Sequence, residues 1–431
     1  MDAFDEILQP TLGALDDSLL RHMPACAYRD YCRWALSARN PVREQWLHLM
    51  GIPQLVRLTS ELLDGTTTRG WEHLVRSTLP MNVYQLYEIV SDNLAIGLAA
   101  TPRDATRSLQ RSVLLGFNDA VIQRLSGSGK AAAELLEPIR AAADRISVFE
   151  QSLSPDKHRA VVSAYLAQAP GIALEDLEHS LWPNLVANLE ACAQLAARMD
   201  EHEVGPIFRR SLINRYRGVS ALIDDPWMTF SRTVQVGIDT ILVEATLIYY
   251  VGVLAEEIHS YPRFGDAVAG GTVTEALYHA ALALRLLNDA GTSLLTGAGE
   301  QRAELVRVLE DTFNGDRAAC GQMAALLRAS APSVGPAMTR IQKDIVHGEF
   351  NLVVHGLQEV HPQQGIPLLG QRLARLSRLY GEAKALLQVH LDSMNRCLGD
   401  GTIGRVIDRF VVFHENLYAH KYHERSGEYA I

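Results

Sequence analysis

Cysteine is scarce in this chain, and the few cysteines present do not pair by spacing. Five occur among 431 residues, an odd number, and no two of them form a Cys-x-x-Cys motif. A disulfide framework needs paired cysteines, and cysteine-based zinc sites need closely spaced ones. We therefore expect free thiols in a reducing compartment, and neither a disulfide-stapled fold nor a cysteine-based zinc site.

Clusters of positive charge and long apolar runs are missing as well. The formal net charge is -10 with no basic segment to offset it, which argues against nucleic acid as a partner, because binding to phosphates needs a basic surface. The first residues, MDAFDEILQP, lack the basic and apolar regions of a signal peptide. The longest apolar run, residues 245–255, is too short to cross a bilayer. We expect a soluble, cytoplasmic protein without a membrane span.

Strand signals are absent too. The sequence shows no alternating runs of Val, Ile and Thr joined by Asn-Gly or Asp-Gly turns. It is rich instead in Leu, Ala, Arg and Glu, which favour helices. Residues 369–391 have a clear amphipathic pattern, with leucines at three- and four-residue steps. These leucines are Leu369, Leu373, Leu376, Leu379 and Leu386. An all-α fold is therefore predicted.

Clusters of Gly, Pro and Ser divide the chain into roughly a dozen or more predicted helices. They fall at residues 126–130, 152–157, 168–171, 264–271, 329–336 and 361–365. The first cluster, SGSGK, is no phosphate-binding P-loop, because that motif needs Gly and Ser/Thr where this chain has Arg124 and Ala131. We predict a single α-helical domain over residues 1–431, with 126–130 as a candidate internal boundary.

Residues 225–258 form the most buried-looking part of the sequence. Asp225 can cap a helix that has Pro226 at its first position. The residues that follow are apolar on nearly every face, which predicts one helix running through the core. Arg232 and Glu244 interrupt this helix, and a charge in such a place is costly unless it is paired or functional.

A second apolar stretch, LALRLLNDAGTSLL at residues 282–295, carries polar side chains in its middle. These are Asn288, Asp289 and Thr292, and Arg285 precedes them. Residues at i, i+4 and i+8 of a helix point to one side, so Asn288 and Thr292 would share a face. Oxygen atoms in such a row suit Mg²⁺, and an Arg can bind a diphosphate bidentately.

The order of these residues resembles the class I terpene synthase superfamily. Arg232, Gly237 and Glu244 are followed by a Pro-containing loop and then by Arg-Leu-Leu-Asn-Asp-x-x-Thr at 285–292. The resemblance implies a large single helical bundle around a central apolar cavity. It also implies an enzyme that ionises a small-molecule prenyl diphosphate with Mg²⁺ and cyclises the resulting cation away from water.

By the same resemblance, Arg232 would be the diphosphate sensor and would bind substrate together with Arg285, while Asn288 and Thr292 would bind Mg²⁺. The third metal position is Thr296 and not an acid, so Glu300, one turn further along, or the neighbouring Asp289 would support the metal. The Asp-rich motif that such enzymes carry on an earlier helix is not recognisable. The candidate for that side is Asp92 in YEIVSDNLAIG. Either the metal site is altered or the fold has been reused.

The same residues also allow a purely structural interpretation. Gly291 suits the C-terminal cap of a helix, and Asn and Asp favour such places. Arg232 and Glu244 could form an ion pair between helices. On this interpretation residues 282–295 are architecture, and the protein is a non-catalytic helical scaffold.

A helical di-iron oxygenase, ferritin-like or haem-oxygenase-like, is a further alternative, with Fe in place of Mg²⁺. Glu256 and His259 have the i, i+3 spacing of di-iron carboxylate helices, and Glu244 precedes them. Other acids and histidines that could join them are His347, Glu349, His355, His414, Glu415, His420 and His423. The Ser-Tyr-Pro that follows His259 indicates a helix end near solvent, which weakens this alternative.

The C-terminal segment 409–431 is rich in aromatic and ionisable residues. It is expected to form a docked helix with a solvated tail, or a cap over the cavity mouth that contributes Arg409 or Tyr418. A homodimer is compatible with the sequence.

Overall fold

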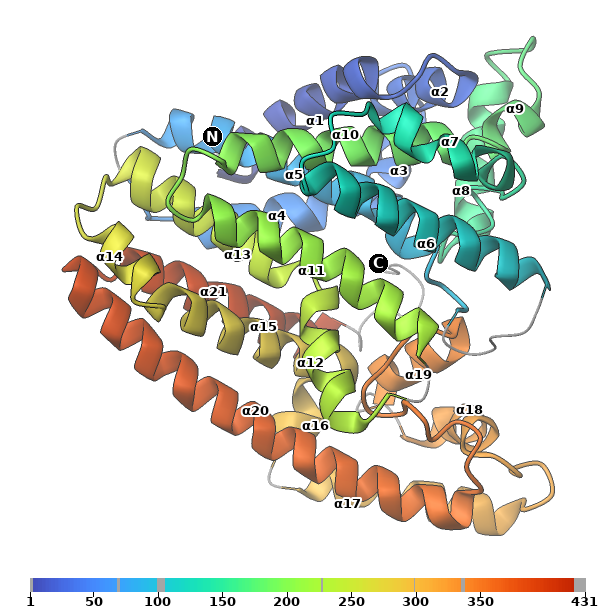
Figure 1. The fold of residues 1–431 in the computed structure, drawn as a ribbon. Helices are drawn as coiled ribbons and strands as arrows, with labels where there is room; N and C mark the ends of the chain where they lie inside the picture. The colour runs from blue at the N-terminus through green and yellow to red at the C-terminus, as the bar shows by residue number, and fades with distance from the viewer. Residues whose placement is uncertain are drawn as a thin grey trace.

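The fold is known from a computed structural model, which describes residues 3–67, 70–98, 105–225, 228–297, 299–334 and 338–421 (Figure 1). Helices account for 77% of the structure, and these residues contain no strand. The all-α prediction is therefore confirmed. His423, one of the histidines considered for iron, lies outside the described residues.

Helices α1 to α11 make up the first half of the chain. Their bounds are α1 (Ala3–His22), α2 (Ala27–Leu36), α3 (Arg43–Leu49), α4 (Ile52–Leu63), α5 (Trp71–Asn93), α6 (Ala105–Leu125), α7 (Ala132–Ala143), α8 (Pro155–Leu166), α9 (Leu174–Glu178), α10 (Leu181–Met199) and α11 (Gly205–Asp224). The cluster at 126–130 is the loop that connects α6 to α7.

The second half contains α12 to α21 and the π-helical segments η1 and η3. Their bounds are α12 (Phe230–Thr240), α13 (Val243–Gly252), η1 (Val253–Ile258), α14 (Phe264–Ala269), α15 (Thr272–Ala290), α16 (Thr292–Thr296), α17 (Glu300–Gly315), α18 (Met323–Val334), α19 (Thr339–His347), α20 (Pro362–Leu398), α21 (Thr402–Asn416) and η3 (Leu417–Lys421).

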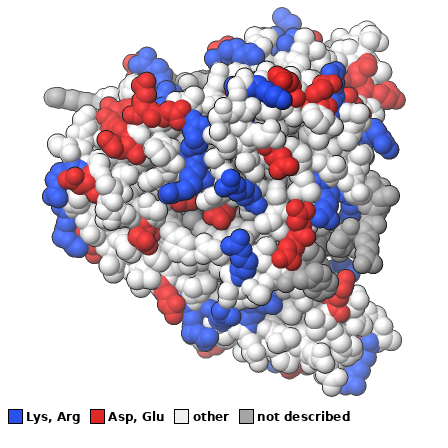
Figure 2. Space-filling model, in the orientation of Figure 1, with Lys and Arg blue, Asp and Glu red and all other residues white. Residues whose placement is uncertain are grey.

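Two hydrophobic clusters fill the interior, and α5 and α10 contribute to both. The smaller cluster also includes residues of α1 to α4, α8 and α9, and the larger one includes the end of α4, α6, α7, α11 and helices of the second half of the chain. Figure 1 shows α1 and α10 on one side of the molecule and α15, α20 and α21 on the other. On the face shown in Figure 2, positive and negative side chains are interspersed.

The amphipathic pattern at 369–391 lies within α20, which runs along one edge of the molecule and packs on α15 (Figure 1). Leu369, Leu373 and Leu376 are buried, and the buried stripe continues through Leu387. Leu386 is 45% exposed, because at about 100° per residue it lies well off that stripe. The predicted helix is confirmed, but Leu386 belongs to its outer face.

The prediction of one helix over residues 225–258 is wrong. Asp225 follows the end of α11, and the next helix, α12, begins at Phe230 with Thr229 as its N-cap. Pro226 and the residue after it lie outside the described part of the chain. The chain then breaks again between α12 and α13 and bends by 43°. The apolar pattern concealed these breaks because the linkers also contain apolar residues, Met228, Ile241 and Leu242, although these are only half-buried.

No single described helix is long and apolar enough to cross a membrane. The bent pair formed by Phe230–Thr240 and Val243–Ile258 meets the criteria of length and composition only when its two parts are counted together. Much of this pair lies inside the larger hydrophobic cluster.

The end of α15 determines how the polar residues of 282–295 are arranged. α15 stops at Ala290, and Gly291 has φ 81° and ψ 156°, a conformation that in practice only glycine adopts. The short helix α16 then starts at Thr292. The predicted role of Gly291 as a C-cap is confirmed, and Asn288 and Thr292 therefore do not share one continuous helix.

Candidate functional site

A cavity of about 460 Å³ is lined by residues that include parts of α5, α6, α8, α11, α15 and α19, the loop between α7 and α8, and the linker between α12 and α13. Small-molecule sites commonly have volumes of about 300–1,000 Å³. Apolar side chains form much of the wall, and charged side chains contribute to it from α5, α11, α15 and α19. This combination suits a ligand with a charged head and an apolar body.

Two carboxylates one helical turn apart mark the α5 side. Glu88 and Asp92 are at i and i+4, so they share a face of the helix. Arg215 from α11 donates to Glu88 Oε2 through Nε and Nη2 at 2.8 and 2.5 Å, and to Asp92 Oδ1 through Nη2 at 2.6 Å. Tyr216 donates its hydroxyl to Glu88 Oε1 at 2.6 Å. The Glu88 side chain is 3% exposed and the Asp92 side chain 65%, so Asp92 stays open to solvent.

The charge on Arg215 is maintained by its two partners. Burial alone would lower the pKa of Arg215, but Asp92 and Glu88 oppose that effect and raise it. Its Nη1 also donates to the backbone carbonyl of Thr240. Burial, followed by the charge of Glu88, raises the pKa of Tyr216 and keeps its phenol a donor. A buried ionic group is tolerated only with good hydrogen bonds, and this one has them.

On the α15 side, Arg285 lines the cavity and is held from behind by Asp289. Arg285 donates through Nε to Asp289 Oδ2 at 3.1 Å and through Nη2 to both carboxylate oxygens at 2.5 and 2.6 Å. The backbone N–H of Leu352 donates to the same carboxylate at 2.8 Å. Burial raises the pKa of Asp289, and the Arg285 guanidinium opposes that rise. The lone pairs of this carboxylate are thus engaged by protein groups.

Asn288 is also engaged by protein groups. Arg340 donates through Nε to its backbone carbonyl at 2.7 Å and through Nη2 to its side-chain oxygen at 2.5 Å. Tyr418 donates its hydroxyl to the same side-chain oxygen at 3.2 Å. In this arrangement Asn288 joins α15 to α19 and η3.

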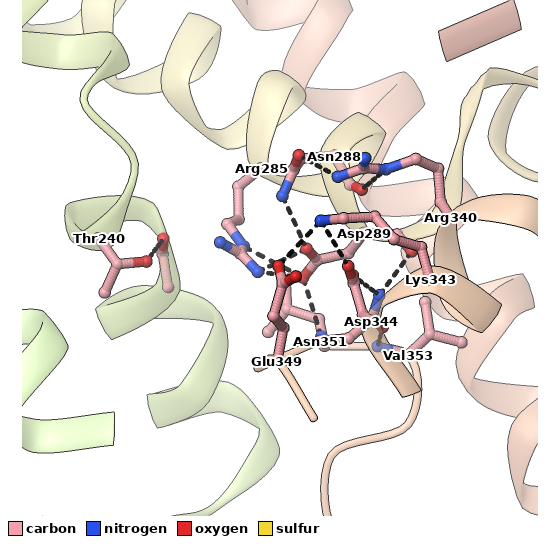
Figure 3. Close-up of polar contacts among 12 residues, drawn as sticks. Thr240, Arg285, Asn288, Asp289, Arg340, Lys343, Asp344, Glu349, Asn351 and Val353 are labelled. Atoms are coloured by element: carbon pink, nitrogen blue, oxygen red, sulfur yellow. Dashed lines mark hydrogen bonds and ion pairs between the residues drawn. The ribbon is translucent and has the colours of Figure 1, made fainter. Parts of the chain in front are cut away.

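α19 and the segment after it complete the polar wall. Lys343 lies 3.4 Å from Asp344 Oδ1 and 2.9 Å from Glu349 Oε2. Burial would lower the pKa of Lys343, but the charge of Asp344 raises it. Asn351 donates through Nδ2 to Asp344 Oδ2 at 2.7 Å and to the Asp289 carbonyl at 2.8 Å. Figure 3 shows this network from α19 and its following loop facing the α15 residues.

The structure brings three of the predicted residues to one cavity. Asp92 lines it from α5, and Arg285 and Asn288 line it from α15. Because α5 and α15 are far apart in the sequence, only the tertiary fold brings these residues together.

The other residues of the predicted Mg²⁺ and diphosphate site do not line this cavity. Arg232 is exposed on the first turn of α12, and the idea that it sits on a helix apolar on all faces is wrong. Thr292 donates its hydroxyl to the carbonyl of Glu415 at 2.7 Å, and Glu300 is exposed at the start of α17. Their roles in metal or diphosphate binding stay predictions.

Glu244, Glu256 and His259, the main candidates for iron ligands, each contact different residues. Glu244 accepts a hydrogen bond from Ser211 at 3.1 Å, and Glu256 accepts the backbone N–H of Glu203 at 3.1 Å. His259 follows η1, and its ring stacks on that of Tyr261. Among the described residues, none of Glu244, Glu256 and His259 belongs to a group of three potential ligand atoms within 4.8 Å.

Sequence reasoning missed four residues of the wall, Glu88, Arg215, Lys343 and Asp344, and it considered Glu349 only as a ligand for iron. Glu88 could have been found as the i−4 neighbour of Asp92 on a predicted helix. No local pattern identifies Arg215 as a wall residue, because RRSLINRYRG contains several arginines. Only the packing of α11 determines which of them lines the cavity.

No protein-family model matches this chain, and comparisons with curated proteins and with solved structures also found no significant match.

Proposed function

We propose that this chain is an isoprenoid-diphosphate-handling enzyme similar in its chemistry to class I terpene synthases. The observation that carries the proposal is a single cavity in which the acidic end of α5 and the Arg285–Asn288 turn of α15 both contribute to the wall. A charged head group and a hydrocarbon chain would then be bound by different parts of one cavity.

The cations of the wall would bind the diphosphate. Arg215, Arg285 and Lys343 all line the cavity. A guanidinium can hold two phosphate oxygens at once, and Lys provides a point charge. Each cation is paired with a carboxylate in this structure. An incoming diphosphate would therefore compete with those carboxylates for the cations.

Among the predicted Mg²⁺ ligands, Asp92 fits the ion best. Its Oδ1 is bound by Arg215, and the side chain is 65% exposed, so it can offer an oxygen to a hydrated ion. Asn288 and Thr292 fit less well, because their side-chain oxygens are already hydrogen-bonded to protein groups. A bound Mg²⁺ would neutralise charge that develops on the departing diphosphate.

The apolar wall would hold the hydrocarbon and exclude water. Phe149, Tyr216 and Phe350 line the cavity. The negative faces of aromatic rings stabilise nearby cations by about 0.5–2 kcal/mol each. An allylic cation formed at the charged end would find such rings in the same cavity, which supports cyclisation as the reaction class.

The test is turnover of geranyl, farnesyl and geranylgeranyl diphosphate by the purified chain, with diphosphate release and hydrocarbon products measured with and without Mg²⁺. We expect Mg²⁺-dependent release from at least one substrate. Asp92→Asn should reduce it at least about tenfold, since it removes a charge from the wall but keeps an acceptor for Arg215. The matched control is Glu72→Gln at the exposed start of the same helix, which should behave like the parent.

Absence of turnover and of binding for all three substrates would reject the proposal in favour of a helical scaffold. Iron in the purified protein, together with no turnover, would favour the oxygenase alternative.

A further inference from the structure

A cluster of ligand-type side chains lies between α15 and α20, outside the cavity wall. It consists of Glu275 and His279 on α15 and His390 on α20. One potential ligand atom from each residue lies within 4.8 Å of the other two. His279 is ten residues before Asp289, which places the cluster about 15 Å further along the α15 axis from the diphosphate end of the cavity.

The geometry of the cluster follows from helix periodicity and from the packing of two helices. Glu275 and His279 are at i and i+4, so they share a face of α15, and His279 Nε2 lies 4.0 Å from Glu275 Oε2. The rings of His279 and His390 stack with centroids 5.4 Å apart and an interplanar angle of 18°. α15 and α20 form the most extensive helix pair among the described residues, so this placement rests on well-packed backbone.

We propose that Glu275, His279 and His390 form a binding site for one transition-metal ion of the zinc type, which joins α15 to α20. Two imidazoles and one carboxylate are ligands that Zn²⁺ accepts, and a water would complete the tetrahedron. Zinc–ligand bonds of about 2.0–2.2 Å place neighbouring ligand atoms about 3.4 Å apart. The Glu275–His279 pair must therefore close by about 0.6 Å and the pairs with His390 by at most about 1.4 Å, which rotation of the exposed Glu275 and partly exposed His390 side chains can supply.

His279 is buried, and its surroundings support a role as a ligand. The residue is 8% exposed, and its Nδ1 has no hydrogen-bond partner among the described residues. The nitrogen that faces Glu275 is Nε2, at 4.0 Å. A metal on Nε2 would give this buried ring a strong polar interaction that the protein groups around it do not provide.

The site is distinct from the cavity and does not depend on the proposed function. Its ligands come from the helix that carries Arg285 and Asn288 and from the helix that supports it. A metal at this position would fix the two helices against each other. The consequence is a gain in stability and no new chemistry at the cavity.

The experiment measures Zn²⁺ binding to the full chain by equilibrium dialysis and calorimetry, with thermal melting as a second readout. The variants are His390→Ala and Glu275→Gln, both at partly exposed or exposed positions where folding should survive. The matched control is His179→Ala, an exposed histidine outside the cluster. Circular dichroism checks that each variant keeps the helical fold.

We expect the parent to bind one more equivalent of Zn²⁺ than His390→Ala does, and Zn²⁺ to raise the melting temperature of the parent but not of this variant. Glu275→Gln should weaken the affinity for that additional Zn²⁺ ion at least about tenfold, and His179→Ala should bind Zn²⁺ like the parent. The proposal is overturned if the parent binds no zinc at micromolar concentrations, or if both cluster variants keep the parent's stoichiometry and affinity.

Discussion

Arg215 on α11 donates to Asp92 on α5 at 2.6 Å, although 123 residues separate them in the chain. The same guanidinium holds the buried Glu88, so one cation serves a buried carboxylate and an exposed one. This relationship links the stability of the cavity wall to the position of its exposed carboxylate.

The first prediction concerns that cation. Arg215→Met should lower the free energy of unfolding by about 3–5 kcal/mol, because it leaves Glu88 buried without its ionic partner. Urea denaturation measures the change. The control is Arg111→Met, which breaks the more exposed pair with Asp224 and should cost less than about 1 kcal/mol. Equal losses of unfolding free energy in the two variants would show that the buried Arg215–Glu88 pair contributes no more to stability than the exposed Arg111–Asp224 pair.

Asn288 separates the architectural and metal-binding interpretations of residues 282–295. Asn288→Leu removes the acceptor used by Arg340 and Tyr418, so we expect a loss of about 1–3 kcal/mol in thermal or urea unfolding. Asn314→Leu at the exposed end of α17 serves as the control and should change stability by about 0.5 kcal/mol or less. Unchanged stability of Asn288→Leu with complete loss of Mg²⁺-dependent turnover would identify Asn288 as a metal ligand.

Gly291 should not tolerate a side chain, for reasons of backbone conformation. A Cβ there would meet only ordinary contacts, the nearest being Arg340 Cγ at 3.7 Å, but the φ of 81° with ψ of 156° is strained for any other residue. Gly291→Ala should therefore cost about 1–3 kcal/mol. Gly381→Ala, in an open position of α20, should instead stabilise by about 0.5–1 kcal/mol. A neutral Gly291→Ala in differential scanning calorimetry would mean that the break between α15 and α16 is not held in this conformation.

Acidification should destabilise the fold through His158, which lines the cavity. Burial lowers the pKa of His158 to about 4. An unfolded His has a pKa near 6.5, so the unfolded state takes up the proton first, and stability is lost as the pH falls from about 6.5 to about 4. Between pH 7 and pH 5 this residue should contribute a loss of about 1–2 kcal/mol.

Urea unfolding of the parent and of His158→Gln at both pH values isolates that contribution. The variant should show a smaller loss on acidification than the parent, whereas His179→Gln, at an exposed position, should retain the parent's loss. Identical pH dependence of the parent and His158→Gln would contradict the depressed pKa.

Much of the secondary structure could be predicted because helix periodicity is a local property. The stripe of leucines in α20 and the glycine that ends α15 are visible within a few residues of sequence. The wrong prediction of one helix over residues 225–258 has the same origin. An apolar pattern reports burial, and it does not say whether a buried segment is one helix or two helices joined by a bend.

The candidate site could be predicted only in part. Arg285 and Asn288 were chosen from a local motif and Asp92 from its place on a predicted apolar helix, and the structure places all three on one cavity. Two of their hydrogen-bond partners were not foreseeable, since Arg340 reaches Asn288 and Arg215 reaches Asp92 from segments far along the chain.

The sequence by itself determined that this protein is all-helical, because composition and periodicity act within one or two turns. The tertiary structure alone decided which charged groups on different helices meet. Of the several arginines in RRSLINRYRG, packing of α11 selects Arg215 for the cavity, where it donates to both Glu88 and Asp92. The packing of α15 on α20 likewise brings His390 to Glu275 and His279. Electrostatic interactions depend on distance in space, and between groups on different helices no local pattern encodes that distance.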